Sequence, residues 1–155
     1  MDERLFRDAM GKFATGITVV SIYDHHEPIG MTVNAFMSIS LDPKLIAISI
    51  DEDAGMYDQL KNTKTFGVSL LKEEQKDLSM IFARQKEKDR EIEFIEQNNV
   101  PVINNSLATL SCEVDQKVEA GDHLIIIAEV TDLTIQDGLP ILYFGGKYRT
   151  IKPND

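Results

Sequence analysis

The chain has 155 residues, with 26 acidic against 16 basic side chains and a formal net charge of −10 at neutral pH. Nucleic acids and anionic membrane surfaces are bound by clustered Lys and Arg, so this balance argues against both as partners. Apolar residues make up 43% of the chain, enough to build a substantial core, and we expect one domain over residues 1–155.

The N-terminal segment has neither the basic start nor the apolar centre of a secretory signal. No run approaches the roughly 18 consecutive apolar residues that a membrane helix needs. The single cysteine, Cys112, cannot close an intramolecular disulfide, which fits a reducing compartment. These features predict a cytoplasmic protein.

The first expected element is an amphipathic helix. Apolar side chains recur at helical spacing from Leu5 to Phe13, and the pattern ends before Thr15-Gly16.

Runs rich in β-branched residues follow and predict strands, separated by turn clusters such as HHEPIG (25–30), Asp42-Pro43 and Asp137-Gly138. The expected elements, in chain order, are strands at ITVVSIYD (17–24), GMTVNAFMSIS (30–40) and LIAISI (45–50), a short helix at MYDQLKN (56–62), a strand at TFGVSLL (65–71), a helix at KEEQKDLSMIFAR (72–84), and strands at 110–118, LIIIAEVTDLTI (124–135) and LPILYF (139–144).

Two of these elements have a clear buried face. In the strand 110–118 the buried positions alternate with polar ones and are Leu110, Cys112, Val114, Gln116 and Val118. In the helix 72–84 one side carries Gln75, Leu78, Ile81 and Phe82.

Six or seven strands with short turns and two or three peripheral helices favour an antiparallel barrel, mainly β, over a βαβ fold, which needs regular alternation of strands and helices. The last three strands are expected to form a meander. For the charged run from Lys86 to Glu93 two interpretations stay open, a solvated helix and a basic cluster that binds an anion.

Few motifs of catalysis are present. His25 and His26 lie in an expected hairpin tip without partners at metal-ligand spacing, so a solvated turn is favoured over a metal site. Cys112 lies on the apolar face of its strand and is expected to be a buried structural thiol rather than a nucleophile. If the chain is an enzyme, a bound cofactor supplies its chemistry.

The stretch GMTVNAFMSIS (30–40) carries no charge in an otherwise acidic chain. Gly30 would let a planar ligand approach the backbone, and Thr32, Asn34, Ser38 and Ser40 offer neutral donors and acceptors that suit an uncharged heterocycle. The alternative from composition alone is an ordinary strand and loop with solvated hydroxyls.

Seven fragments in order resemble the flavin reductase family, the small NAD(P)H:flavin oxidoreductases of two-component monooxygenases, which fold as an FMN-binding split barrel. The fragments cover nearly the whole chain and are FRDAMGKFATGITVVS, GMTVNAFMSISLDPKLIAISID, FGVSLL, Gln75 with Leu78, Phe82-Ala83, GDH at 121–123 and LYFGGKY at 142–148. The resemblance implies a homodimer that binds FMN, or FAD in some members, near the subunit interface. It also implies that NADH or NADPH donates a hydride to the flavin, and that reduced flavin diffuses to a partner monooxygenase.

The resemblance further implies the site. Its cofactor-binding residues would be Gly30, Met31, Thr32, Val33, Asn34, Ser38, Ser40, Ser49, Ile50, Asp51, Phe82, Ala83, Arg84 and Tyr148, with no metal. Thr32, Val33 and Asn34 would contact the ring and ribityl chain, and Phe82 to Arg84 would close over the phosphate end. His123 would be the catalytic residue, and it and Tyr148 match positions on the nicotinamide side.

The chain departs from the family pattern at EDAGM (52–56), where many relatives carry a basic residue and serines, and at Ser69, where asparagine is common. Glu52 and Asp53 would repel a phosphate, so we expect Arg84 to be the cation that binds it.

Two other functions fit the fold class. One is a flavin-binding electron carrier that has no nicotinamide activity. The other is a barrel that oxidises a pyridoxine-type amine, which does not account for GDH and LYFGGKY. The sequence leaves open NADH against NADPH and FMN against FAD.

Overall fold

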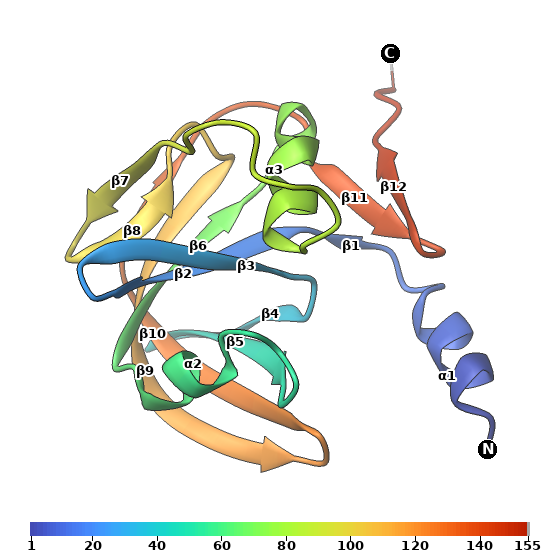
Figure 1. The fold of residues 1–155 in the computed structure, drawn as a ribbon, viewed down its shortest axis with the longest axis horizontal. Helices are drawn as coiled ribbons and strands as arrows, with labels where there is room; N and C mark the ends of the chain where they lie inside the picture. Colours follow the sequence, from blue (N-terminus) through green and yellow to red (C-terminus); the bar gives the residue numbers. More distant parts are fainter. Residues whose placement is uncertain (155) are drawn as a thin grey trace.

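The computed structural model describes residues 1–154, and its centre is a seven-stranded antiparallel sheet (Figure 1). The strand order is β3-β2-β6-β9-β10-β5-β4. The strands are β2 (Thr18–Asp24), β3 (Glu27–Val33), β4 (Phe36–Leu41), β5 (Lys44–Asp51), β6 (Thr65–Leu70), β9 (Ala108–Ala120) and β10 (His123–Ile135). The mainly β antiparallel fold expected from the sequence is confirmed.

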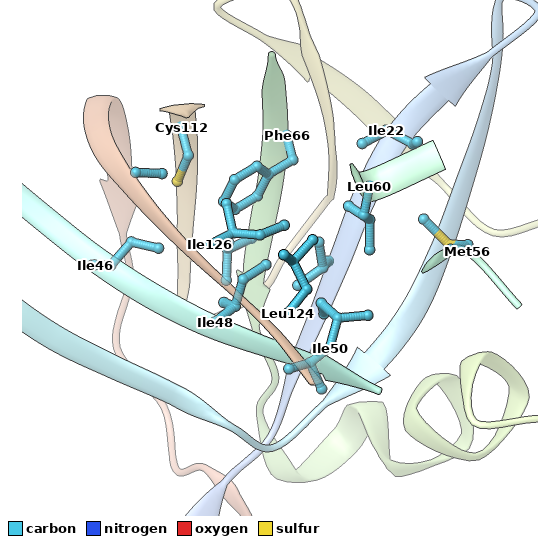
Figure 2. Packing of buried hydrophobic residues seen from close by; sticks show 14 residues of the cluster. Ile22, Ile46, Ile48, Ile50, Met56, Leu60, Phe66, Cys112, Leu124 and Ile126 are labelled. Carbon is cyan, nitrogen blue, oxygen red and sulfur yellow. The ribbon is translucent and has the colours of Figure 1, made fainter. Parts of the chain in front are cut away.

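The sheet curves around one apolar interior. Val33 of β3 at one edge packs into the same cluster as Ile46 and Ile48 of β5 near the other edge. Figure 2 shows Ile46 and Ile48 with labelled side chains of β6, β9 and β10 pointing toward one another. Phe66 and Ile126 have no exposed surface in this cluster, and burying such side chains is the main source of stability for a fold of this kind.

Cys112 belongs to the same cluster, which confirms the expected buried thiol. Burial raises the pKa of its thiol to about 12, because the thiolate loses solvation among apolar side chains.

Two smaller sheets flank the main one. The first has the order β1-β11-β12, with β1 (Thr15–Gly16), β11 (Ile141–Phe144) and β12 (Lys147–Thr150); the second is a hairpin of β7 (Phe94–Gln97) and β8 (Val100–Ile103). A second apolar cluster joins both to the main sheet and contains Ile17, Val19, Leu71, Ile103 and Ile141.

Three helices complete the described chain: α1 (Glu3–Met10), α2 (Tyr57–Asn62) and α3 (Lys76–Phe82), the last preceded by a 3₁₀ turn at Glu73–Gln75. The Asp2 carboxylate caps α1 by accepting a hydrogen bond from the Arg4 backbone N–H at 2.9 Å. None of the residues of α1 is buried, and the helix lies to one side of the sheets, beyond the β11–β12 hairpin (Figure 1). Among residues 1–154, no helix has the length and apolar character to cross a membrane.

The face pattern expected for 110–118 holds only in part: Cys112 is buried and Glu113 exposed, but Ser111, expected on the wet face, is buried. After Val114 the ladder skips Asp115, since Val114 and Gln116 pair with the consecutive residues Ala128 and Ile127. This bulge reverses the faces beyond it, and Val118, expected to be buried, is 36% exposed.

Two other expectations were wrong, and one open alternative is decided. The strand at 139–144 does not continue a meander, because β11 pairs with β1 and β12 instead of β10. Of the two interpretations left open for the charged run from Lys86 to Glu93, the helix is excluded, and charges of this run pair locally, as in Lys86 with Asp77 and Asp89 at 3.5 and 3.3 Å. In HHEPIG only His25 and His26 turn, and the rest of the segment belongs to β3.

Candidate functional site

A cavity of about 260 Å³ opens between β3, α3 and the β11–β12 hairpin. We call it the hydroxyl cavity, since side-chain hydroxyl and amide groups supply most of its polar wall. Its lining residues are Ile17, Thr32, Asn34, Ser79, Ala83, Gln85, Tyr143 and Tyr148. Four of the residues expected at the site from the sequence, Thr32, Asn34, Ala83 and Tyr148, therefore meet here.

A chain of hydrogen bonds fixes the wall of this cavity. The Thr32 hydroxyl donates to the Ser79 carbonyl at 2.7 Å, and the Ser79 and Tyr148 hydroxyl oxygens are 2.9 Å apart. The Tyr148 hydroxyl also donates to Gln85 Oε1 at 3.3 Å, so the Ser79 hydroxyl is the donor to Tyr148. The Tyr143 ring packs edge-on against Tyr148 at 5.4 Å between centroids. This leaves the Tyr148 hydroxyl little freedom to turn away.

Asn34 lies where β3 has ended and β4 has not begun. Its Oδ1 atom is buried and has no hydrogen-bond partner among residues 1–154. Asn34 also lines a second, mostly apolar cavity of about 210 Å³, whose wall includes Thr15, Phe36 and Leu71. A buried acceptor without a donor is costly, and a ligand N–H in either cavity would satisfy it.

The space above Gly30 is taken by a side chain. A Cβ at this position would lie 3.0 Å from Val19 Cγ1 and 3.2 Å from the Phe82 ring, so the glycine accommodates Phe82. Phe82 in turn packs edge-on against Phe94 at 5.9 Å. The contact between Gly30 and Phe82 thus holds α3 against β3. Because Phe82 occupies the space above Gly30, a ligand cannot approach the backbone there.

Arg84 follows α3 in a left-handed conformation, with φ of 59°. Its guanidinium lies over Gly55, where a Cβ would come within 2.6 Å of Nη2. Among residues 1–154 no carboxylate lies within 4.0 Å of the Arg84 guanidinium. The structure thus brings a cation beside the loop that carries the acids Glu52 and Asp53.

His123 opens β10 and pairs across the ladder with Asp51, the last residue of β5. Its Nδ1 atom lies 2.8 Å from the Asp122 carboxylate. This hydrogen bond is the main reason that the pKa of Asp122 is below its ordinary value. The pair lies on the wall of a cavity of about 680 Å³ between α1 and the ends of β5 and β10, which we call the helix cavity. It is lined by Met1, Asp2, Glu3, Phe6, Arg7, Asp51, Asp122 and His123.

The other expected site residues lie in neither the hydroxyl nor the helix cavity. The side chains of Val33 and Ile50 are buried in the core, so only their backbone groups are left for a ligand. Met31 packs beside the same core, and Ser38 and Ser40 lie on the edge strand β4. Ser49 lines a shallow apolar hollow together with Phe36, Met37 and Ile125.

Sequence reasoning missed Ser79, Gln85 and Tyr143. Ser79 lies on the same side of the helix as Gln75 and Phe82, and its hydroxyl on this apolar face was a sign that the sequence offered.

His25 and His26, considered above as a metal site, form an exposed hairpin tip. Residues 1–154 contain no cluster of three metal-ligating side chains.

The curved antiparallel sheet, its covering helices and the uncharged cavity define a split-barrel protein of the flavin reductase type. The flavin reductase PheA2, solved in its native state, is 48% identical, covers 99% of this chain and 100% of its own, and superposes with a TM-score of 0.95. The NADH:FAD oxidoreductase SgcE6 of Streptomyces globisporus C-1027, solved with NAD and FAD fragments, is 33% identical with a TM-score of 0.90, covering 98% of this chain and 94% of its own.

Sequence comparison agrees with the structural match. An NADH-dependent flavin reductase of Rhodococcus sp is 35% identical over 149 residues, which is 94% of this chain and 85% of the relative. Residues 10–152 match the model of the flavin reductase like domain. The chain belongs to the flavin reductase like domain family.

Proposed function

We propose that this chain transfers a hydride from NADH to FMN or FAD, with the flavin ring in the hydroxyl cavity and the nicotinamide nucleotide entering from the side of His123. NADH, a proton and oxidised flavin give NAD⁺ and reduced flavin, so the reaction balances without another reductant. The relatives are named as NADH-dependent, which favours NADH over NADPH as the donor.

The observation that carries this proposal is the unpaired Oδ1 of Asn34. It is a buried, neutral acceptor in a cavity whose other polar groups are neutral as well. The flavin ring has an imide N–H that can donate to it, and an uncharged ring needs no charged wall. The residues present therefore fit a flavin.

Each further residue has a role in this arrangement. Thr32 and Tyr148 fix the cavity wall through Ser79 and orient what binds there. Arg84 binds the flavin phosphate and offsets the repulsion from Glu52 and Asp53.

The bound flavin supplies the hydride-accepting chemistry, and the chain positions both partners for direct transfer. His123 orients the nicotinamide and can pass a proton through its imidazole, whose Nδ1 is fixed by the Asp122 carboxylate.

The proposal includes a homodimer and a cytoplasmic location, where nicotinamide nucleotides are available. Exposed apolar side chains support a second copy as the partner of the edge strand β4; they are Met37, Ile39 and Leu41. Some relatives are named as reductase components of monooxygenases, such as that of 4-hydroxyphenylacetate 3-monooxygenase from Thermus thermophilus. We therefore include diffusion of reduced flavin to a partner monooxygenase.

The test is oxidation of NADH and of NADPH by purified protein with excess FMN or FAD, followed at the nicotinamide absorbance band. We expect rapid oxidation that depends on added flavin. An electron carrier of the same fold would bind flavin but leave both nucleotides at the uncatalysed rate, and that result would refute the enzyme.

A further inference from the structure

One face of α1 forms a wall of the helix cavity. Asp2, Glu3, Phe6 and Arg7 line it, and their spacing of one and four residues puts them on the same side of the helix. The rest of its wall includes Asp51 and the Asp122–His123 pair. A helix without a single buried side chain thus contributes, with its N-cap Asp2, four of the eight residues that line the largest cavity described.

Arg7 is the one Arg or Lys side chain on this wall within residues 1–154. Its guanidinium has no carboxylate within 4.0 Å in the described chain, although four acids line the same cavity. Two of those acids are already engaged, Asp2 with the Arg4 backbone N–H and Asp122 with His123. The fork of N–H donors on Arg7 is therefore available to an anion from solution.

Phe6 lies next to Arg7 on the wall and is 54% exposed. An aromatic face open to a cavity can stack on a planar base or a nicotinamide ring. A guanidinium beside an aromatic ring suits a ligand that joins phosphates to a planar ring, which is the chemistry of a nucleotide.

We propose that α1 forms part of the binding site of the hydride donor, with Arg7 binding the pyrophosphate of NADH and Phe6 stacking on one of its rings. This rests on the proposed function, which puts the nicotinamide next to His123. The cavity, of about 680 Å³, falls within the size range of small-molecule sites. Because the carboxylates on the wall repel phosphate, binding of the anion depends on Arg7.

The test compares Arg7→Ala with Arg4→Ala, which removes the same charge from the same helix at a position outside the cavity wall. With saturating FMN, we expect Arg7→Ala to raise the KM for NADH about tenfold, as for loss of a charge-assisted hydrogen bond, with kcat little changed. Arg4→Ala should stay within about twofold of wild type, and Arg7→Lys should recover part of the loss. Phe6→Ala and Leu5→Ala form a second matched pair, with a raised KM expected only for Phe6→Ala.

Binding of ADP-ribose, measured by calorimetry on the FMN-loaded protein, gives a readout that does not depend on turnover. We expect it to weaken in Arg7→Ala and not in Arg4→Ala, while FMN affinity and thermal unfolding stay at wild-type values in both. Equal KM and equal ADP-ribose affinity for the two variants would overturn the inference. Wild-type protein that oxidises neither NADH nor NADPH would instead refute the proposed function.

Discussion

The hydrogen bond between Ser79 and Tyr148 lends itself to a double-mutant cycle. Ser79→Ala removes one hydroxyl of this 2.9 Å hydrogen bond, and Tyr148→Phe removes the other. Ser79 has no exposed surface. A hydrogen bond of this kind contributes roughly 0.5–1.5 kcal/mol to the free energy of unfolding. Tyr148→Phe also loses the longer contact to Gln85 at 3.3 Å, so it should cost somewhat more than Ser79→Ala.

Since both substitutions remove the same bond, the double variant should cost about 1 kcal/mol less than the sum of the two. Urea unfolding followed by far-UV circular dichroism measures all four proteins. The control is Tyr23→Phe, which breaks a contact with Glu96 at 3.1 Å elsewhere on the surface and should combine additively with Ser79→Ala. Additivity for Ser79→Ala with Tyr148→Phe would refute the assignment of this bond as a structural support of the hydroxyl cavity.

Four further outcomes are expected. Arg84→Ala should weaken FMN binding about tenfold in a fluorescence titration and leave riboflavin, which has no phosphate, unaffected. His123→Asn should slow hydride transfer on the order of 10²-fold in stopped-flow experiments while FMN affinity is retained; loss of FMN binding alone would contradict its role. Gly67→Ala should lower the free energy of unfolding by about 3 kcal/mol, because its Cβ would lie 2.2 Å from the Pro101 carbonyl oxygen. The control Gly16→Ala, whose Cβ meets no atom within 4 Å, should leave the stability unchanged. Urea unfolding measures both variants. Burial raises the pKa of the Cys112 thiol from 9.0 to about 12, so above pH 9 the folded protein keeps a proton that the unfolded chain loses. Between pH 9 and pH 12 the free energy of unfolding of the wild type should therefore fall more steeply than that of Cys112→Ala. Parallel pH profiles of the two proteins would contradict this.

Local patterns in the sequence identified the strands of the main sheet, because the regular alternation of side chains between the two faces repeats along many residues. Alternation from Leu110 to Val114 indicated β9 correctly, and the apolar run after His123 indicated β10. The rule failed at the bulge at Asp115, since nothing in the local sequence shows which residue a partner strand will skip.

The β7–β8 hairpin was missed although its turn carried a sign. Asn98 and Asn99 both adopt positive φ, 47° and 71°, which is the conformation of the tightest hairpin turns and one that asparagine tolerates. The charged run before Phe94 obscured this pattern. The two-residue strand β1 is too short to produce a pattern at all.

The candidate site was predictable in part for the same reason. Thr32 and Asn34 stand out locally as polar residues in an uncharged stretch. Their relation to Ser79 and Tyr148 depends on segments 47 and 69 residues apart in the chain, and such pairings follow from tertiary packing. The resemblance to a family pointed to Tyr148, whereas Ser79 needed the structure.

The position of Tyr148 in the chain has a consequence for folding. All seven strands of the main sheet lie within residues 18–135, whereas Tyr143 and Tyr148 line the hydroxyl cavity from the β11–β12 hairpin that follows them. Every strand pair of the main sheet can therefore form without this hairpin. The cavity proposed for the flavin is completed by a segment outside the sheet, when the hairpin docks on α3.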